Sequence, residues 1–283
     1  MDKDILKQFI YNSLKEDIGD GDHTSLSTIP ETATGKAKLL IKEDGIVAGV
    51  ALALDIFKAV DPNLHVDVLI EDGASVKYGD IVLLVTGNTR SILAAERLVL
   101  NTMQRMSGIA TTTSSVVKQL ATTQTKVLDT RKTTPNLRFL EKWAVRIGGG
   151  VNHRFGLYDM ILIKDNHVDY AGGISPAIKA AQKYLKQNSL NLQIEIEVRN
   201  LQELQEVINL GGVDRILLDN FNFEELKRAV ALVDGKFITE ASGGITLENA
   251  LQYAKCGVDF ISMGALTHSV KSLDMSLKAV VKN

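Results

Sequence analysis

Short apolar runs alternate with helical patterns from about residue 121 onward, and this alternation constrains the fold most. The predicted strands are 126–129, 160–163, 193–198, 215–218, 237–240 and 258–262, and the predicted helices are 136–147, 174–187, 201–210, 223–233, 246–255 and 270–280. Such alternation is typical of a parallel sheet whose strands are joined by helical crossovers. A barrel and an open doubly wound sheet both satisfy the pattern.

Polar or glycine residues follow every one of these strands, which favours the barrel. A barrel collects its site from the carboxyl ends of many strands, whereas an open sheet places its site at one switch point. The strand-end residues are Arg131, Lys132, Lys164, Glu197, Asp219, Ser242 to Gly244, and Gly264. We therefore expect these side chains to gather at one end of a barrel.

The segment 129–167 is cationic in a chain whose net charge is −2. It holds seven Lys and Arg against four Asp and Glu, a local excess of three positive charges. Arg138, Lys142 and Arg146 follow helical spacing and are interpreted as a solvated helix face. The other four cations follow strands or a glycine run: Arg131, Lys132, Arg154 and Lys164. Because an unpaired buried charge is costly, cations in such places indicate a site for a polyanionic ligand.

Carboxylates and glycines complete the candidate site. Glu195 and Glu197 lie two residues apart on one strand and so share a face, either inside the barrel or toward the helices. Glu195 suits a buried ion pair equally well. Asp219 ends an apolar strand and needs a metal, a ribose hydroxyl or a cation as a partner. Ser242 to Gly244 and Gly264 fit either simple turns or backbone cradles for phosphate.

Composition excludes several classes of protein. With 45% hydrophobic and 23% charged residues, the chain is an ordinary globular protein, and its charge gives no footprint for nucleic acid. Its most apolar window, 46–57, is too short to span a membrane. One cysteine and a start, MDKDILKQF, without a signal-peptide core predict a cytoplasmic location. Asp17, Asp20 and Asp22 form either a calcium loop or, as we favour, local caps.

The run TRKTTPNLRFLEKWAVRIGGGVNHRFGLYDMILIKDNH resembles the signature of the quinolinate phosphoribosyltransferase family without a gap. The resemblance continues in ERLVLNTMQRMSGIATTT, IEIEVRN, ILLDNF, EASGGI and SMGALTHS, and so covers essentially the whole chain. Asn136 departs from it, because glycine is expected after Pro135. The resemblance implies an α/β fold with an N-terminal sandwich domain over 1–112, an incomplete seven-stranded α/β barrel over 113–268, and a C-terminal helix over 269–283 that packs on the N-terminal domain.

The resemblance also implies an activity, a pentosyl transfer. Quinolinate and phosphoribosyl pyrophosphate would react with Mg²⁺ and no organic cofactor, giving nicotinate mononucleotide, pyrophosphate and CO₂. The catalytic residues would be Lys132, Lys164, Glu197 and Asp219, and the two carboxylates would also be the candidate Mg²⁺ ligands. Substrate would be bound by these four and by Arg105, Thr130, Arg131, His153, Arg154, Ser242, Gly243, Gly244, Ser262 and Gly264. Arg105 would act across a homodimer or higher homo-oligomer, in the active site of the partner.

Three other readings remain open at this point. A molybdenum-transport paralogue shares the fold, but here Lys164 and the following DNH retain the quinolinate-type order. A nicotinate phosphoribosyltransferase would bind a substrate with one carboxylate fewer. A non-catalytic module would bind a phosphorylated ligand and tolerate the loss of Glu197 and Asp219.

Overall fold

The computed structural model describes residues 3–280, and the chain divides into two compact units. The first comprises the residues up to Thr112, Phe139–Gly148 and the residues from Val270 onward. The second comprises Thr113–Arg138 and Gly149–Ser269. Residues 139–148, which we expected within the catalytic barrel domain, therefore belong to the first unit by their contacts.

A six-stranded parallel sheet forms the second unit. Its strands are β6 (Lys126–Leu128), β7 (Ile161–Ile163), β8 (Ile194–Val198), β9 (Arg215–Asp219), β10 (Ile238–Ser242) and β11 (Phe260–Ser262). Their spatial order is β7-β8-β9-β10-β11-β6, so the winding never reverses direction. This order excludes the doubly wound alternative, which requires a switch point, and confirms the α/β fold with barrel-type winding.

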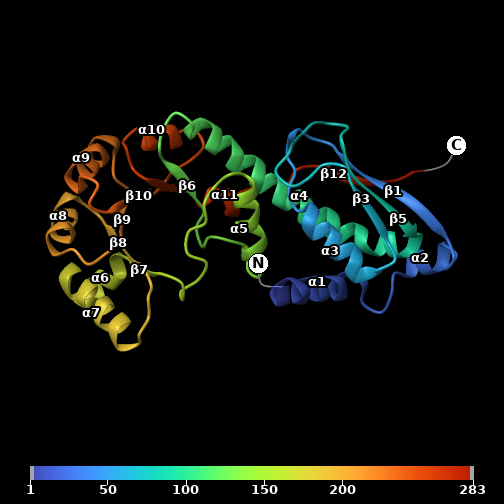
Figure 1. The fold of residues 1–283 in the computed structure, drawn as a ribbon, viewed down its shortest axis with the longest axis horizontal. Coiled ribbons are helices and arrows are strands. Elements are labelled where there is room, and N and C mark those ends of the chain that lie inside the picture. The colour runs from blue at the N-terminus through green and yellow to red at the C-terminus, as the bar shows by residue number, and fades with distance from the viewer. Residues whose placement is uncertain (1–2, 281–283) are drawn as a thin grey trace. The chain divides into compact units, whose positions relative to one another are not determined.

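Six helices of this unit follow its strands, and all but the last, α11, lie on the outer side of the curved row of strands (Figure 1). They are α6 (Asp165–Ala171), α7 (Ile174–Gln187), α8 (Leu201–Leu210), α9 (Phe223–Val233), α10 (Ala250–Ala254) and α11 (Ala265–His268). β6 and β7 end the sheet and do not pair with each other, so the barrel is incomplete. Where a seventh strand was expected, the described residues form one parallel bridge, between Leu128 and Val151.

The strand register decides which side chains point into the barrel. Glu195 pairs with Arg215, Leu217 with Glu240, and Asp219 with Ser242. Paired residues share a face, and so do residues two apart on a strand. Glu195 and Glu197 therefore share one face with Asp219, Glu240 and Ser242. Because the helices cover the other face, this shared face is the barrel interior.

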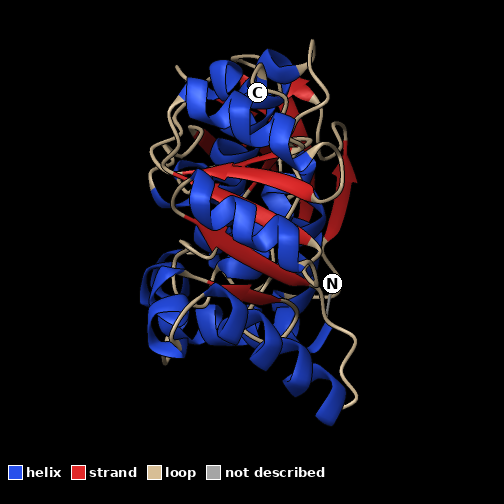
Figure 2. Ribbon diagram, turned by 90° about the vertical axis from the view of Figure 1, so that its left-hand side faces the viewer, coloured by secondary structure: helices blue, strands red, loops and turns tan. Residues whose placement is uncertain are grey.

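An antiparallel sheet packed on helices forms the first unit (Figure 2). The sheet order is β12 (Met275–Ala279), β1 (Thr34–Ile41), β5 (Ile81–Asn88) and β3 (His65–Val68), and β2 (Gly45–Ile46) pairs separately with β4 (Ser75–Val76). Its helices are α1 (Lys3–Ile18), α2 (His23–Thr28), α3 (Val50–Val60), most of α4 (Thr89–Leu120) and α5 (Arg138–Ile147). Leu39, Ile41, Leu83, Ile56 and Met103 are fully buried and form part of its core.

The predicted C-terminal helix is wrong. Residues 275–279 form the strand β12, which pairs antiparallel with β1 from Met275↔Ile41 to Ala279↔Ala37. Met275 and Leu277 are buried while Lys278 is exposed, an alternation with the period of two that a strand requires. The last three residues of the predicted segment, 281–283, lie outside the described residues.

Asp22 in the aspartate-rich loop caps a helix, as favoured from the sequence. Asp22 is the N-cap of α2, and its carboxylate accepts hydrogen bonds from the backbone N–H and the hydroxyl of Ser25. These bonds hold the pKa of Asp22 below its usual value. Neither Asp17 nor Asp20 belongs to a group of three metal-donor side chains within the part of the chain that is described.

Candidate functional site

The predicted strand-end residues of the second unit gather at the carboxyl ends of its strands, as the register requires. Arg131 and Lys132 are exposed after β6, and Lys164 is exposed after β7. Asp219 and Ser242 lie half-buried side by side at the ends of β9 and β10. The site therefore combines exposed cations with partly buried oxygen donors on one rim.

Lys132 has three contacts, one with Thr130 nearby in the sequence and two with residues that follow β11. Its N–H donates to Thr130 Oγ1 at 3.0 Å, and its carbonyl accepts from Thr267 Oγ1 at 2.8 Å. Its aliphatic chain crosses Gly264, where an added Cβ would lie 2.9 Å from Lys132 Cδ. Gly264 is thus needed for the close approach of this side chain and not for a positive φ angle.

Arg154 lies near a second guanidinium. Its Nη1 donates to the Met160 carbonyl at 3.2 Å, which fixes the direction of the side chain. Burial and the charge of Arg131 lower its pKa, whereas Glu195 and Asp159 oppose that shift. Two arginines close together disfavour each other unless an anion lies between them, so the pair is suited to a carboxylate or phosphate ligand.

Lys164 and Glu197 form the cation–carboxylate pair of the rim. Lys164 Nζ lies 3.6 Å from Glu197 Oε2, and the lysine side chain is 51% exposed while that of Glu197 is 9% exposed. Burial raises the pKa of Glu197, and the charges of Asp219 and Asp165 raise it further against the pull of Lys164. Three carboxylates with one nearby lysine leave this part of the rim rich in anionic oxygen.

Two glycines follow Ser242, the last residue of β10. Gly243 and Gly244 have φ angles of 97° and 61°, which side-chain-bearing residues rarely adopt. A Cβ on Gly243 would collide with Asn220, whose N–H donates to the Ser242 carbonyl at 2.9 Å. A Cβ on Gly244 would meet nothing within 4 Å, so the backbone there faces open space. Gly244 therefore leaves room for a ligand near the main chain, whereas Gly243 leaves room for Asn220.

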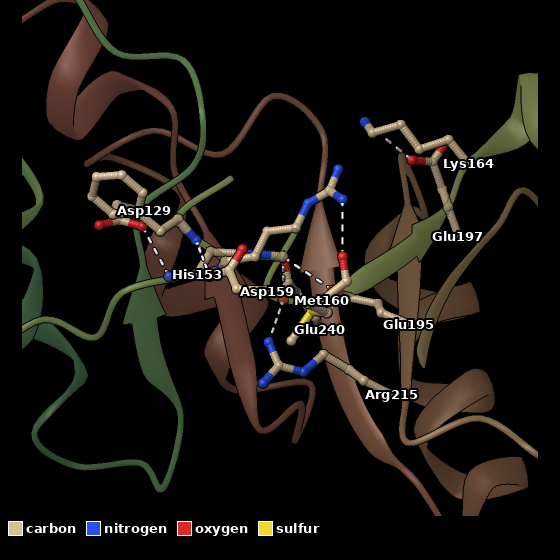
Figure 3. A network of polar contacts seen from close by, with 11 residues as sticks. Asp129, His153, Asp159, Met160, Lys164, Glu195, Glu197, Arg215 and Glu240 are labelled. Atoms are coloured by element: carbon tan, nitrogen blue, oxygen red, sulfur yellow. Dashed lines mark hydrogen bonds and ion pairs between the residues drawn. The ribbon is translucent and has the colours of Figure 1, made fainter. Parts of the chain in front are cut away.

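A buried ionic network lies inside the barrel below this rim (Figure 3). His153 Nε2 lies 3.0 Å from Glu195 Oε2 and 3.6 Å from Glu240 Oε2. Arg215 Nη1 donates to Glu240 Oε2 at 3.0 Å. His153 therefore differs from the other predicted cations, because its ring points into a buried pair of carboxylates.

Glu240 was missed by the sequence analysis, although EASGGI was among the family segments. Its carboxyl is fully buried, and burial together with the charge of Glu195 raises its pKa to about 7. A carboxylate in the middle of a short strand, two residues before Ser242 and hence on the same face, is the signal that could have revealed it.

Arg105 belongs to the first unit and lies within the continuous helix α4, not at a helix end. Its Nε and Nη2 both donate to Glu141 Oε1, at 2.9 and 2.5 Å. Lys142, which we interpreted as part of a solvated face, is instead 2% exposed. Helical spacing alone could not indicate which side of this charged helix is covered.

A cavity of about 330 Å³ opens beside Arg154 in the second unit. It is lined by all three residues of β7, by His167, and by small side chains of α6 and α7, including Ala171 and Ala177. The lining is mainly apolar, with Arg154 as its only formally charged member.

Taken with the barrel winding, these features define a class of protein: a barrel that binds a small anionic substrate and phosphate groups at the carboxyl ends of its strands. Comparison with known proteins narrows the class. The family models for quinolinate phosphoribosyl transferase match twice, the N-terminal domain over residues 22–107 and the C-terminal domain over residues 109–278. The chain belongs to the quinolinate phosphoribosyltransferase family.

Individual relatives agree with this assignment. Quinolinate phosphoribosyltransferase [decarboxylating] 2, mitochondrial, from Nicotiana glauca is 48% identical over 96% of this chain and 82% of its own length. A probable nicotinate-nucleotide pyrophosphorylase [carboxylating] from Bacillus subtilis is 43% identical over 98% of this chain and 94% of its own. The crystal structure of NadC from Streptococcus pyogenes superposes with a TM-score of 0.93 at 36% identity, covering 99% of both chains.

Proposed function

We propose that this protein transfers the phosphoribosyl group of phosphoribosyl pyrophosphate to quinolinate and then releases CO₂, yielding nicotinate mononucleotide and pyrophosphate. The observation that carries the proposal is the placement of Arg131, Arg154 and Lys164 on one rim with Glu197 and Asp219. A substrate with two carboxylates needs several cations, and a phosphorylated sugar needs partners for its hydroxyls and phosphates.

Quinolinate would be held by cations on both sides of its ring. Arg131 and Arg154 supply planar forks that match a carboxylate, and Lys164 supplies a point charge. Arg105 would complete this set from a second copy of the chain, which makes a homodimer the smallest active form. His153 would support the set from behind, since its ring is buried between carboxylates.

The phosphates of the second substrate would bind on the glycine side of the rim. Lys132 offers one positive charge, Thr130 one hydroxyl, and Gly244 a stretch of main chain that faces open space. Ser262 and Gly264, at the end of β11, extend this surface beside Lys132.

Glu197 and Asp219 fit a role with the ribose and with Mg²⁺. Carboxylate oxygens are the ligands that Mg²⁺ prefers. Burial and then the charge of Asp219 raise the pKa of Glu197, and a bound cation would offset the repulsion between the two carboxylates. When bound with the pyrophosphate, Mg²⁺ would neutralise charge on the leaving group. The two carboxylates would also stabilise the positive charge that develops on the sugar as the bond from C1 to oxygen breaks.

Decarboxylation requires no separate base. Once the ring nitrogen has bonded to C1 of the sugar it carries positive charge, and the electron pair left by CO₂ remains on the adjacent ring carbon until that carbon takes up a proton. Arg131, Arg154 and Lys164 would keep the surroundings cationic and so favour this negative charge.

The decisive test supplies purified protein with phosphoribosyl pyrophosphate, Mg²⁺ and either quinolinate or nicotinate. We expect nicotinate mononucleotide and CO₂ in equal amounts from quinolinate, and no product from nicotinate. Product from nicotinate would establish the monoacid activity instead. If folded protein forms no product from either substrate, the remaining hypotheses are the transport-associated paralogue and a non-catalytic binding module.

Variants make the test specific to this rim. Glu197→Gln and Asp219→Asn should each lower kcat about 10²-fold or more, as should Lys132→Ala and Arg154→Ala. Lys227→Gln, which removes an exposed cation paired with Glu224 on α9, is the charge control and should leave turnover unchanged. Wild-type turnover in Glu197→Gln and Asp219→Asn would remove both residues from the mechanism.

The location of the protein is a separate proposal. Within residues 3–280, no helix is long and apolar enough to cross a membrane. The single cysteine, Cys256, is buried as a free thiol, and this suits a reducing compartment such as the cytoplasm. Activity confined to the cytosolic fraction of the source cells would support this assignment.

A further inference from the structure

The proposed mechanism leaves unexplained the ionic network inside the barrel. Glu195 on β8 and Glu240 on β10 are both fully buried. Arg215 lies between them on β9, the strand that pairs with both. Both oxygens of Glu195 and Oε1 of Glu240 lack a hydrogen bond of normal geometry. Replacing such a group by apolar side chains is commonly neutral or stabilising, so stability alone is a poor reason for its presence.

His153 connects this network to the rim. Its Nδ1 accepts the N–H of Arg154 at 2.6 Å, so Nδ1 is unprotonated and the ring proton lies on Nε2. Nε2 faces both carboxylates, at 3.0 Å and 3.6 Å. The His153 N–H donates to Asp129 Oδ1 at 2.8 Å, which anchors the backbone on the β6 side.

The segment that carries Arg154 has no helix or long strand of its own, and side-chain hydrogen bonds help to hold it, including one from Asn152 to Asp129 and one from Arg138 to the Phe155 carbonyl. It follows Gly148 to Gly150, residues that constrain a backbone least, and only one β-bridge, at Val151, precedes it. The imidazole of His153 therefore holds the backbone N–H of Arg154 in place from inside the barrel. The carboxylates of Glu195 and Glu240 in turn hold the His153 ring through Nε2.

Charge reinforces this geometry. Arg131 and Arg154 are close enough to repel each other, and Glu195 is the buried carboxylate that offsets the repulsion at Arg154. The guanidinium of Arg154 donates to the Met160 carbonyl at 3.2 Å, just before the first residue of β7. Glu195 and Glu240 would thus act on the substrate without touching it.

We propose that Glu195 and Glu240 are positioning residues for the quinolinate carboxylates, because they seat the His153 ring and thereby fix the direction of Arg154. The proposal rests on the activity proposed above. It assigns the two glutamates to the quinolinate half of the site and separates them from Glu197 and Asp219, which lie on the same barrel face but serve the sugar.

The same three side chains also form the one group in residues 3–280 with metal-ligand geometry, since donor atoms of His153, Glu195 and Glu240 lie within 4.8 Å of one another. Arg215 argues against a metal there. Its Nη1 already occupies Glu240 Oε2 at 3.0 Å, and Arg154 adds further positive charge nearby. A second cation would meet this repulsion in a site closed to water.

The test measures the two substrates separately. Glu240→Gln and Glu195→Gln keep the side-chain shape but remove a negative charge that faces His153 Nε2. We expect the dissociation constant of quinolinate, from calorimetric titration, to rise about tenfold, which corresponds to about 1.4 kcal/mol. The dissociation constant of phosphoribosyl pyrophosphate should change by less than about twofold. The matched control is Thr239→Val.

Thr239 lies next to Glu240 on β10 and is equally buried, and its hydroxyl donates to Asp259 at 2.8 Å. Thr239→Val should lower the unfolding temperature and leave both dissociation constants unchanged. If the glutamine variants behave in the same way, the network is structural only and the proposal is overturned. If both substrates weaken equally, the network supports the whole rim, and the assignment to quinolinate is wrong.

A double-mutant cycle tests the route through Arg154 and needs only one of the two glutamine variants to fold. In an Arg154→Ala background, Glu240→Gln or Glu195→Gln should no longer weaken quinolinate binding. An undiminished effect in that background would refute the positioning route. One equivalent of tightly bound transition metal in the wild type, lost in Glu240→Gln, would replace the proposal by a metal site. Failure of the proposed function would be visible separately, as a wild-type protein that does not turn over quinolinate.

Discussion

Two nitrogens of Arg105 donate to a single oxygen of Glu141, and this carboxylate is 1% exposed whereas the arginine side chain is 30% exposed. The buried Glu141 carboxylate thus holds the Arg105 guanidinium, while part of the arginine side chain remains exposed to solvent. A rigidly held guanidinium loses less conformational entropy when it binds a ligand than a free one does.

Glu141→Gln should therefore weaken both the fold and the binding of substrate. Removal of the charge should lower the free energy of unfolding by about 2 kcal/mol, less than for a fully buried pair because Arg105 is partly solvated. If Arg105 reaches a partner's substrate, the KM for quinolinate should rise as well. Urea unfolding and steady-state kinetics check the two effects, with Glu203→Gln, a partner of the exposed Arg199, as the control.

Gly264→Ala should reduce activity through Lys132. The new Cβ would lie 2.9 Å from Lys132 Cδ and 3.0 Å from His268 Cδ2, both in side chains that can move aside. We expect kcat/KM to fall at least about tenfold, because small misplacements of a binding group are costly, while stability changes little. In a Lys132→Ala background the same substitution should have no further effect on kcat/KM. A persisting loss would indicate another cause.

Glu240→Gln should change how stability depends on pH. The pKa of Glu240 is about 7 in the folded protein, above the usual value of 4.5, so between these values the folded state retains a proton that the unfolded state loses. This group therefore makes the wild type progressively less stable as the pH rises from 4.5 to 7. The stability of Glu240→Gln relative to wild type should rise across that window, as measured by urea unfolding at each pH. A constant difference would contradict a shifted Glu240.

Asn136→Gly should stabilise the protein. Asn136 has a φ angle of 64°, in the left-handed region where glycine is unstrained. We expect the free energy of unfolding to rise by about 0.5 kcal/mol, and Asn136→Ala to lower it by about 1 kcal/mol. The urea midpoints of the two variants should move in opposite directions. A lower midpoint for the glycine variant would show that the asparagine side chain itself is needed.

The barrel could be predicted from the sequence because buried parallel strands are short, continuous apolar runs with polar ends. Residues 160–163 and 215–218 appear in this way, and both lie within one residue of the observed strands. The site could be located for the same reason, since strand ends in a barrel meet. The expected activity came from the resemblance to a family and not from this pattern.

Other features required the three-dimensional structure. Leu273, Met275 and Leu277 suit either a strand or one helix face, and pairing with β1 decides the matter. The segment NTMQRMSGIATTT predicts a helix that breaks near Ser107 and Gly108, but α4 runs through both residues. The hydroxyl of Ser107 instead bonds to the backbone of Ala48, and Gly108 lets the backbone of Lys271 approach. The role of Glu240 depends on its neighbours across the sheet, which no local pattern reveals.

The pairing of β12 with β1 has a consequence for biosynthesis. Residues 34–41 leave the ribosome early, yet one of their two hydrogen-bonding neighbours is supplied only by residues 275–279. Until residues 275–279 have been synthesised, that side of β1 is an open edge able to pair with other nascent chains. A stop codon that removes the last ten residues would therefore do more than shorten the protein. It would leave the N-terminal sheet permanently unfinished and prone to aggregate, with every residue of the catalytic rim still present.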